Sequence, residues 1–337
     1  MIKGENYDLD DVYNMDETGI CWKSLPKKTL IHAGERGAEG GKIKKDRFTA
    51  AMCANATGTH RLPLLVIGKY QNPRCFKHVV SLPVHYRWQK SSWITSVIFS
   101  DWLLTFKRLV ERHQAKNGRS GKVLLLVDNC AAHNTVEGFD FGDKFKLVFL
   151  PPNTTSLIQP MDQGVIVKVK RLFQGKFLRK VLQCKGGIVK FYDDYDMKDA
   201  IDMLVASWNE LTPDNLRRAW NNIMPFREDR DITKSLTVEP DNDEDWTELI
   251  QKIDRHVTVA DVHDWMEEKE KAEEEVTGDD TEDSDIPELE YDDDSNVGDD
   301  VNDELETAFR VVLKWAEKHR DEHVKTMVET LYSFFNQ

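Results

Sequence analysis

The sequence predicts an α/β fold in which helices are layered on a mixed sheet, and three patterns lead to this prediction. The first half of the chain contains short, partly β-branched apolar segments punctuated by Gly, Pro or Asn, a pattern typical of strands. Two later segments, 122–128 and 146–150, are apolar almost throughout, as expected of central strands covered on both faces. Strands first, and then helices alternating with buried strands, favour an α/β layer fold.

The expected elements follow from local periodicity. Segment 91–118 is expected to be a helix, because its apolar residues recur at three- and four-residue steps and Asn117-Gly118 ends the pattern. Segment 163–182 carries one apolar stripe from Val165 to Val181 and is also expected to be helical. Further helices are expected within 194–226. The strands expected before these helices are 11–16, 28–33, 47–56 and 62–68.

The chain has two halves of opposite charge. Residues 1–230 contain 36 Lys and Arg against 25 Asp and Glu, a net charge of +11. Residues 231–337 contain 10 against 35, a net charge of −25, and the two halves sum to the overall −14. A basic body joined to an acidic tail is consistent with a polyanionic partner.

The composition also predicts how the chain is divided. We expect a main domain over 8–226, a helical or extended connection over 227–265 and an acidic disordered linker over 266–304. A C-terminal amphipathic helix is expected over 305–337, docked either on the domain or on a partner. The longest apolar runs are too short to cross a bilayer, so no membrane association is expected.

Cysteine usage indicates an intracellular protein with reduced thiols. The chain has five cysteines and no CxxC pair. A disulfide framework is therefore not expected, and a structural zinc site lacks its usual ligand spacing.

Three aspartates occupy positions where a catalytic site could form. Asp16 ends a short predicted strand, Asp128 ends the most apolar strand, and Asp162 precedes an amphipathic helix. Carboxylates gathered at one sheet edge can bind divalent cations such as Mg²⁺, and two cations can promote an in-line phosphoryl displacement. Taken singly, Asp16 could be a turn former, Asp128 a strand-end acceptor and Asp162 a helix N-cap, so spacing alone leaves both interpretations open.

Three motifs together resemble a known family. NMDETG at 14–19, the apolar strand running into DNCAAH at 128–133, and LPPNTTSLIQPMDQGVI at 150–166 resemble the transposase-derived endonuclease domain of the pogo, Tigger and jerky group, which includes relatives of centromere protein B. The likeness is closest to the jerky and Tigger proteins and covers about residues 8 to 226. It implies an RNase H-like fold, a mixed five-stranded sheet flanked by helices.

The resemblance also implies a site and its cofactors. Asp16, Asp128 and Asp162 match the acidic triad, which in this family binds two Mg²⁺ or Mn²⁺ ions for DNA strand cleavage and transfer. Asn129 and His133 accompany the second aspartate and either orient a ligand or serve in capping and packing.

A basic segment follows the third motif. Its cations are expected either to contact DNA phosphates or to form an ordinary solvated helix face. The residues concerned are Lys168, Lys170, Arg171, Lys176, Arg179 and Lys180.

These observations predict a nuclear, transposase-derived DNA-binding protein with a metal-dependent endonuclease domain. Family members usually carry helix-turn-helix modules ahead of this domain, and here only 15 residues precede Asp16, so mostly non-specific DNA contact is expected. Two alternatives stay open: a domesticated, catalytically silent chromatin-associated protein, and a protein–protein adaptor that self-associates or binds a partner through 305–337.

Overall fold

A computed structural model describes residues 7–26, 29, 46–134, 142–151, 154–223 and 246–274. The strand expected at 28–33 lies outside this part of the chain, apart from Thr29. The helix expected at 305–337 and most of the acidic segment lie outside it too.

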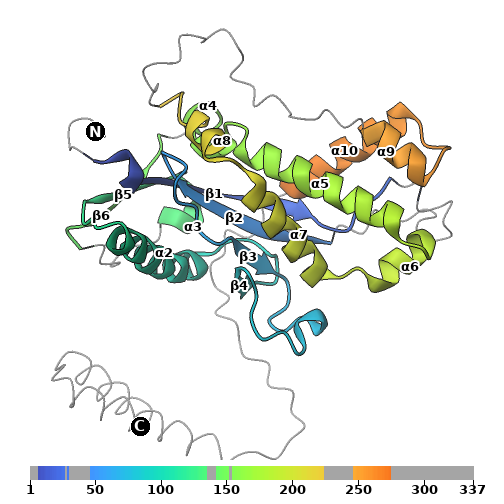
Figure 1. The fold of residues 1–337 in the computed structure, drawn as a ribbon, viewed down its shortest axis with the longest axis horizontal. Helices are drawn as coiled ribbons and strands as arrows, with labels where there is room; N and C mark the ends of the chain where they lie inside the picture. The colour runs from blue at the N-terminus through green and yellow to red at the C-terminus, as the bar shows by residue number, and fades with distance from the viewer. Residues whose placement is uncertain are drawn as a thin grey trace, which may run out of the picture. The chain divides into compact units, whose positions relative to one another are not determined.

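A mixed sheet forms the centre of the described fold (Figure 1). Its strands lie in the order β4-β3-β2-β1-β5-β6. The β1–β2 and β2–β3 pairs are antiparallel, whereas β1–β5, β5–β6 and β3–β4 are parallel. The strand bounds are β1 Val12–Cys21, β2 Arg47–Asn55, β3 Leu65–Gly68, β4 His85–Trp88, β5 Val123–Val127 and β6 Phe145–Phe149.

The predicted α/β class is confirmed, with one correction to the sheet. The sheet has six strands rather than five, because the short edge strand β4 pairs with β3. Its four residues, HYRW, are all partly exposed, so the segment lacks the apolar run by which the other strands were predicted. Strand β1 is also longer than predicted, because its pairing with β2 continues to Cys21 opposite Arg47.

Helices cover both faces of the sheet (Figure 1). The predicted helices at 91–118 and 163–182 are confirmed as α2 and α5. Thr95 caps the start of α2 by accepting a hydrogen bond from the backbone N–H of Ile98. None of the described helices is long and apolar enough to cross a membrane. The helix bounds are α2 Ser96–Lys116, α3 Ala131–Asn134, α4 Thr155–Ile158, α5 Val165–Gln183, α6 Gly187–Asp194, α7 Met197–Glu210, α8 Pro213–Arg218, α9 Trp246–Ile253 and α10 Val259–Glu274, with 3₁₀ turns η1 Leu9–Asp11, η2 Arg74–Phe76 and η3 Pro160–Asp162.

The two faces of the sheet have separate apolar cores. On one face, Tyr13 and Met15 of β1 pack with the buried stripe of α2. On the other face, Ile20 of β1 packs with α5, α7 and the helix pair α9–α10. Alternation along β1 therefore sends successive side chains to opposite cores.

Helix α10 packs on the sheet, which the sequence did not indicate. Trp265 is 2% exposed, and its indole N–H donates to the Ser24 hydroxyl at 2.9 Å. A carboxylate oxygen of Glu273 accepts a hydrogen bond from the backbone N–H of Cys21 at 3.0 Å. Residues 266–274, predicted as the start of an acidic disordered linker, are thus the second half of a docked helix.

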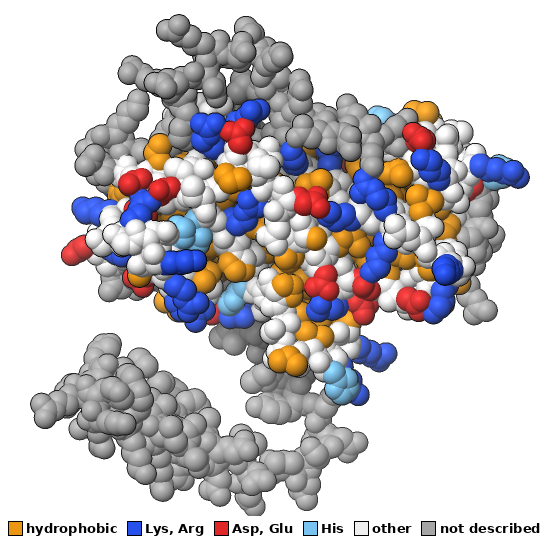
Figure 2. Space-filling view, in the orientation of Figure 1, with side chains coloured by type: hydrophobic (Ala, Val, Ile, Leu, Met, Phe, Trp, Pro, Cys, Tyr) orange, Lys and Arg blue, Asp and Glu red, His pale blue; other side chains and the backbone are white. Residues whose placement is uncertain are grey.

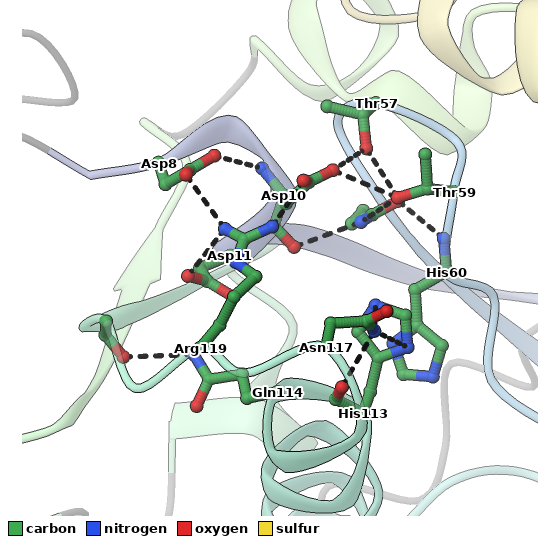
Figure 3. A network of polar contacts seen from close by, with 12 residues as sticks. Asp8, Asp10, Asp11, Thr57, Thr59, His60, His113, Gln114, Asn117 and Arg119 are labelled. Atoms are coloured by element: carbon green, nitrogen blue, oxygen red, sulfur yellow. Dashed lines mark hydrogen bonds and ion pairs between the residues drawn. The ribbon is translucent and has the colours of Figure 1, made fainter.

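A polar network fixes the start of β1 (Figure 3). The Arg119 guanidinium pairs with Asp8, Asp10 and Asp11, and Thr57 also donates to Asp10. Because Asp11 is only 1% exposed, this network compensates a buried charge next to the strand that carries Asp16.

Candidate functional site

The first two predicted aspartates are brought side by side by the pairing of β1 with β5. The parallel register aligns Val12 with Leu124 and Asn14 with Leu126, where the pairing ends. Continuing the register by two residues places Asp16 level with Asp128. Side chains alternate along a strand, so Asp16 lies on the same face as Ile20, which packs with α5, whereas Asp128 directly follows the last residue of β5.

The third aspartate reaches the same place through a 3₁₀ turn. Asp162 is the last residue of η3, whose first residue is Pro160. Helix α5 begins later, after an N-cap glycine, Gly164, with φ of 86°. Asp162 is therefore not the helix N-cap, so that alternative interpretation is wrong.

Asn14 ties this turn to the two strands. Its side-chain amide donates to the Leu126 carbonyl oxygen of β5 at 3.0 Å, and its carboxamide oxygen accepts from the backbone N–H of Met161 at 2.9 Å. Asn14 is fully buried. One side chain thus links β1, β5 and η3, the three segments that carry or precede the aspartates.

Asp16 and Asp162 interact directly. The pKa of Asp16 is raised well above its usual value by burial and by the negative charges of Asp162 and Glu17, although the nearby Gln159 amide acts in the opposite direction. The pKa of Asp162 is raised by desolvation and by the charges of Asp128 and Glu17, against the effects of its hydrogen bond with Asp16 and of Lys170. Two carboxylates in contact cannot both ionise easily without a compensating cation.

Asp128 is held from behind by a buried histidine. One of its carboxylate oxygens, Oδ1, accepts from Nδ1 of His133 at 2.6 Å and from the backbone N–H of Cys130 at 3.3 Å. The His133 ring is fully buried and packs 4.4 Å from the Phe99 ring, centroid to centroid. His133 therefore orients Asp128, whereas Asn129 is exposed at the turn.

Glu17 completes this arrangement and was not predicted. Its carboxylate Oε2 lies 3.4 Å from Nε2 of His133, on the opposite side of the ring from Asp128. Burial alone would lower the pKa of His133, but the Glu17 charge and the hydrogen bond to Asp128 outweigh burial and raise it to about 11. Glu17 adjoins Asp16 in the NMDETG motif, yet only the folded chain shows that it contacts His133.

The donor set of the three aspartates fits divalent cations. Mg²⁺ and Mn²⁺ prefer carboxylate oxygens. The pKa values of Asp16 and Asp162 are raised by burial and by neighbouring negative charges, and a cation would relieve the repulsion between these charges. Among the described residues, the oxygens of the three aspartates do not all lie within 4.8 Å of one another. Asp16 and Asp162 form the tighter pair, and Asp128 stands beside them.

The predicted basic face belongs to α5, and several of its cations pair with acidic residues. Lys176 pairs with Glu210 and Lys180 with Asp199, both on α7. Lys170 pairs with the buried Glu273 of α10 at 2.8 Å. Figure 2 accordingly shows Lys and Arg side chains interspersed with Asp and Glu over this face.

A six-stranded mixed sheet with helices on both faces is the architecture of an RNase H-like DDE domain. The family model for the DDE superfamily endonuclease matches residues 45–220, which is more than half of the chain. The chain belongs to this family.

Individual relatives agree with this assignment. The chain is 37% identical over 248 residues to Tigger transposable element-derived protein 7 of Homo sapiens, covering 68% of this chain and 45% of that protein. It is 39% identical over 220 residues to the human Jerky protein homolog, covering 64% and 37%. It is 34% identical over 212 residues to CENP-B homolog protein 2 of Schizosaccharomyces pombe, covering 60% and 39%. The chain thus spans less than half the length of these relatives.

Proposed function

We propose that this chain is a transposase-derived, metal-dependent DNA endonuclease domain that cleaves and transfers phosphodiester strands. The observation that supports the proposal is that Asp16 interacts directly with Asp162 and that Asp128 acts on Asp162, with raised pKa values at Asp16 and Asp162. Buried carboxylates that repel one another in the absence of a cation are costly for a fold. A bound cation would offset this repulsion between the buried carboxylates.

Asp16 and Asp128 would contribute to cation binding in different ways. Asp16 is 7% exposed and accepts a hydrogen bond from the Glu17 backbone N–H at 2.8 Å, which fixes its orientation. Asp128 has Oδ1 engaged by His133, so its other oxygen is the one that faces a cation. Two Mg²⁺ or Mn²⁺ ions held by these carboxylates would activate a water or a DNA 3′-hydroxyl and would stabilise the leaving oxygen.

DNA is the proposed partner, and the nucleus is the proposed location. The three aspartates lie beside the basic helix α5, whose predicted phosphate contacts are Lys168, Lys170, Arg171, Lys176, Arg179 and Lys180. Relatives that carry the names CENP-B homolog protein 2 and ARS-binding protein 1 support DNA as the partner. A phosphate backbone contacted by few cations gives weak, salt-sensitive binding.

The decisive test is cleavage of nicked and hairpin DNA by the purified chain with Mn²⁺. Cleavage should occur with the wild type and with Asp193→Asn, which alters an exposed aspartate on α6, and should be lost in Asp128→Asn. If no substrate is cut although the protein binds both DNA and Mn²⁺, the nuclease proposal fails. That result would support the domesticated, catalytically silent alternative.

A further inference from the structure

A cluster of side chains of the types that can bind a metal ion lies on the other face of β1 from Asp16. It consists of Glu17 on β1, Cys130 in the turn after β5 and His133 on α3, whose ligand atoms all lie within 4.8 Å of one another. His133 is fully buried, and the other two residues are partly buried. This cluster is distinct from the three aspartates, since its donors are a thiol, an imidazole and a single carboxylate.

Two atoms in the cluster lack hydrogen bonds. Nε2 of His133 and Oε2 of Glu17 are both buried without a hydrogen-bond partner in the described part of the chain. They face each other as an ion pair at 3.4 Å, which exceeds the 2.7–2.9 Å typical of charge-assisted hydrogen bonds. Buried polar atoms of this kind call for an explanation, and an ion not present in the structure is one.

The separation of these atoms matches a tetrahedral metal site. Two ligands about 2.1 Å from a tetrahedral zinc ion are separated by roughly 3.4 Å, which is the distance between Nε2 and Oε2. The other ring nitrogen, Nδ1, is bonded to the Asp128 carboxylate at 2.6 Å. Metal-binding histidines are typically oriented by such a carboxylate on the opposite ring nitrogen.

We propose that Glu17, Cys130 and His133 bind a zinc ion, with a fourth position left for water. A thiolate and an imidazole favour Zn²⁺ over Mg²⁺ or Mn²⁺, which prefer oxygen donors. The ion takes the place of the Nε2 proton and of the thiol proton, both of which are released on binding. The inference does not depend on nuclease activity.

The position of the site explains what the ion would do. Pairing of β1 with β5 ends at Asn14 and Leu126, two residues before Asp16 and Asp128. Zinc bound by Glu17 on one side and by Cys130 and His133 on the other would link the two strand ends beyond their last backbone hydrogen bond. It would therefore stabilise the placement of both aspartates from the opposite face of the sheet.

The test measures zinc on the purified full chain after dialysis against zinc-containing and then metal-free buffer. About one zinc per chain is expected, falling close to zero in Cys130→Ser and in His133→Asn. Zinc should be retained in Cys75→Ser, which changes another partly buried cysteine, and in Asp162→Asn, which changes the aspartate site alone.

Cobalt substitution gives a second readout. Co²⁺ bound at this site should show a thiolate-to-metal charge-transfer band that disappears in Cys130→Ser, while cooperative urea unfolding shows that this mild variant still folds. The proposal is overturned if the wild type holds no stoichiometric zinc, or if zinc persists in Cys130→Ser. Loss of zinc in Asp162→Asn, or in His263→Gln of the exposed group formed by His263, Asp264 and Glu267, would also overturn it.

Discussion

Removing the Glu273 carboxylate should detach the end of helix α10 from strand β1. Glu273 is 4% exposed, and it pairs with Lys170 at 2.8 Å and with Lys269 at 3.4 Å. It also accepts the hydrogen bond from the backbone N–H of Cys21, the last residue of β1. Burial alone would raise the pKa of Glu273, but the two lysines outweigh burial and lower it, so the carboxylate is charged in the folded state.

The magnitude follows from these contacts. Removing one partner from a buried ion pair costs about 3–5 kcal/mol. Because Lys170 is 22% exposed and can regain some hydration, we expect Glu273→Ala to lower the free energy of unfolding by about 3 kcal/mol. Glu273→Gln keeps an oxygen acceptor for Cys21, and that hydrogen bond is worth about 1 kcal/mol. Its expected loss is therefore about 2 kcal/mol.

Urea unfolding followed by tryptophan fluorescence measures these losses at neutral pH. The melting temperature should fall by about 6–12 °C in Glu273→Ala, at about 2–4 °C per kcal/mol. Glu270→Ala is the matched control, since Glu270 is exposed on the same helix. If Glu273→Ala and Glu270→Ala unfold at the same urea concentration, α10 does not unfold together with the sheet, and our reasoning is refuted.

Three further predictions concern single positions. Asp16→Asn should raise the urea midpoint of the metal-free protein and abolish its response to Mn²⁺, because a raised pKa means that the ionised carboxylate destabilises the fold as pH rises; a lower metal-free midpoint would contradict this. Burial and the neighbouring His113 lower the pKa of His60 from 6.5 to about 4. The neutral His60 ring therefore contributes fully to the stability of the fold above pH 6.5, and this contribution is lost as the pH falls toward 4. His60→Gln should therefore reduce the drop in urea midpoint between neutral pH and about pH 5, and an unchanged drop would argue against this assignment. Gly58→Ala should destabilise the fold more than Gly118→Ala does. Both glycines have a positive φ, 72° at Gly58 and 65° at Gly118. A Cβ at position 58 would lie 2.2 Å from the Pro213 carbonyl oxygen, whereas a Cβ at position 118 would meet nothing within 4 Å. The expected loss at 118 is about 1–2 kcal/mol, and equal losses in thermal melts would count against the clash.

Sequence periodicity predicted the elements that carry the site. The run VLLLV ahead of Asp128 is apolar because β5 is covered on both faces, and this is visible in the order of residues alone. The alternation that sends Asp16 to one face is likewise local. Strand β4 was missed because its four residues are all partly exposed, so they do not form the apolar run by which the other strands were predicted.

The contacts that orient the aspartates could not be predicted in the same way. Asn14 and Glu17 both stand in the NMDETG motif, but their partners are Leu126, Met161 and His133, more than a hundred residues away. Which side chains meet depends on the register of β1 with β5. A shift of one residue would turn every side chain of the strand to the opposite face of the sheet.

Sequence alone also did not predict the charge partners of the basic helix α5. Composition alone counts Lys170 among six cations available to phosphate, whereas the fold pairs it with Glu273. The acidic composition after residue 266 indicated a linker, but Trp265 and Ala272 are buried and hold α10 on the sheet.

The sequence by itself determined the α/β class, the main strands and helices and the three candidate aspartates, because periodicity and motif are properties of neighbouring residues. Only the tertiary structure decided the charge partners, the docked helix and the Glu17–Cys130–His133 cluster, because these depend on packing between segments that are distant in the chain.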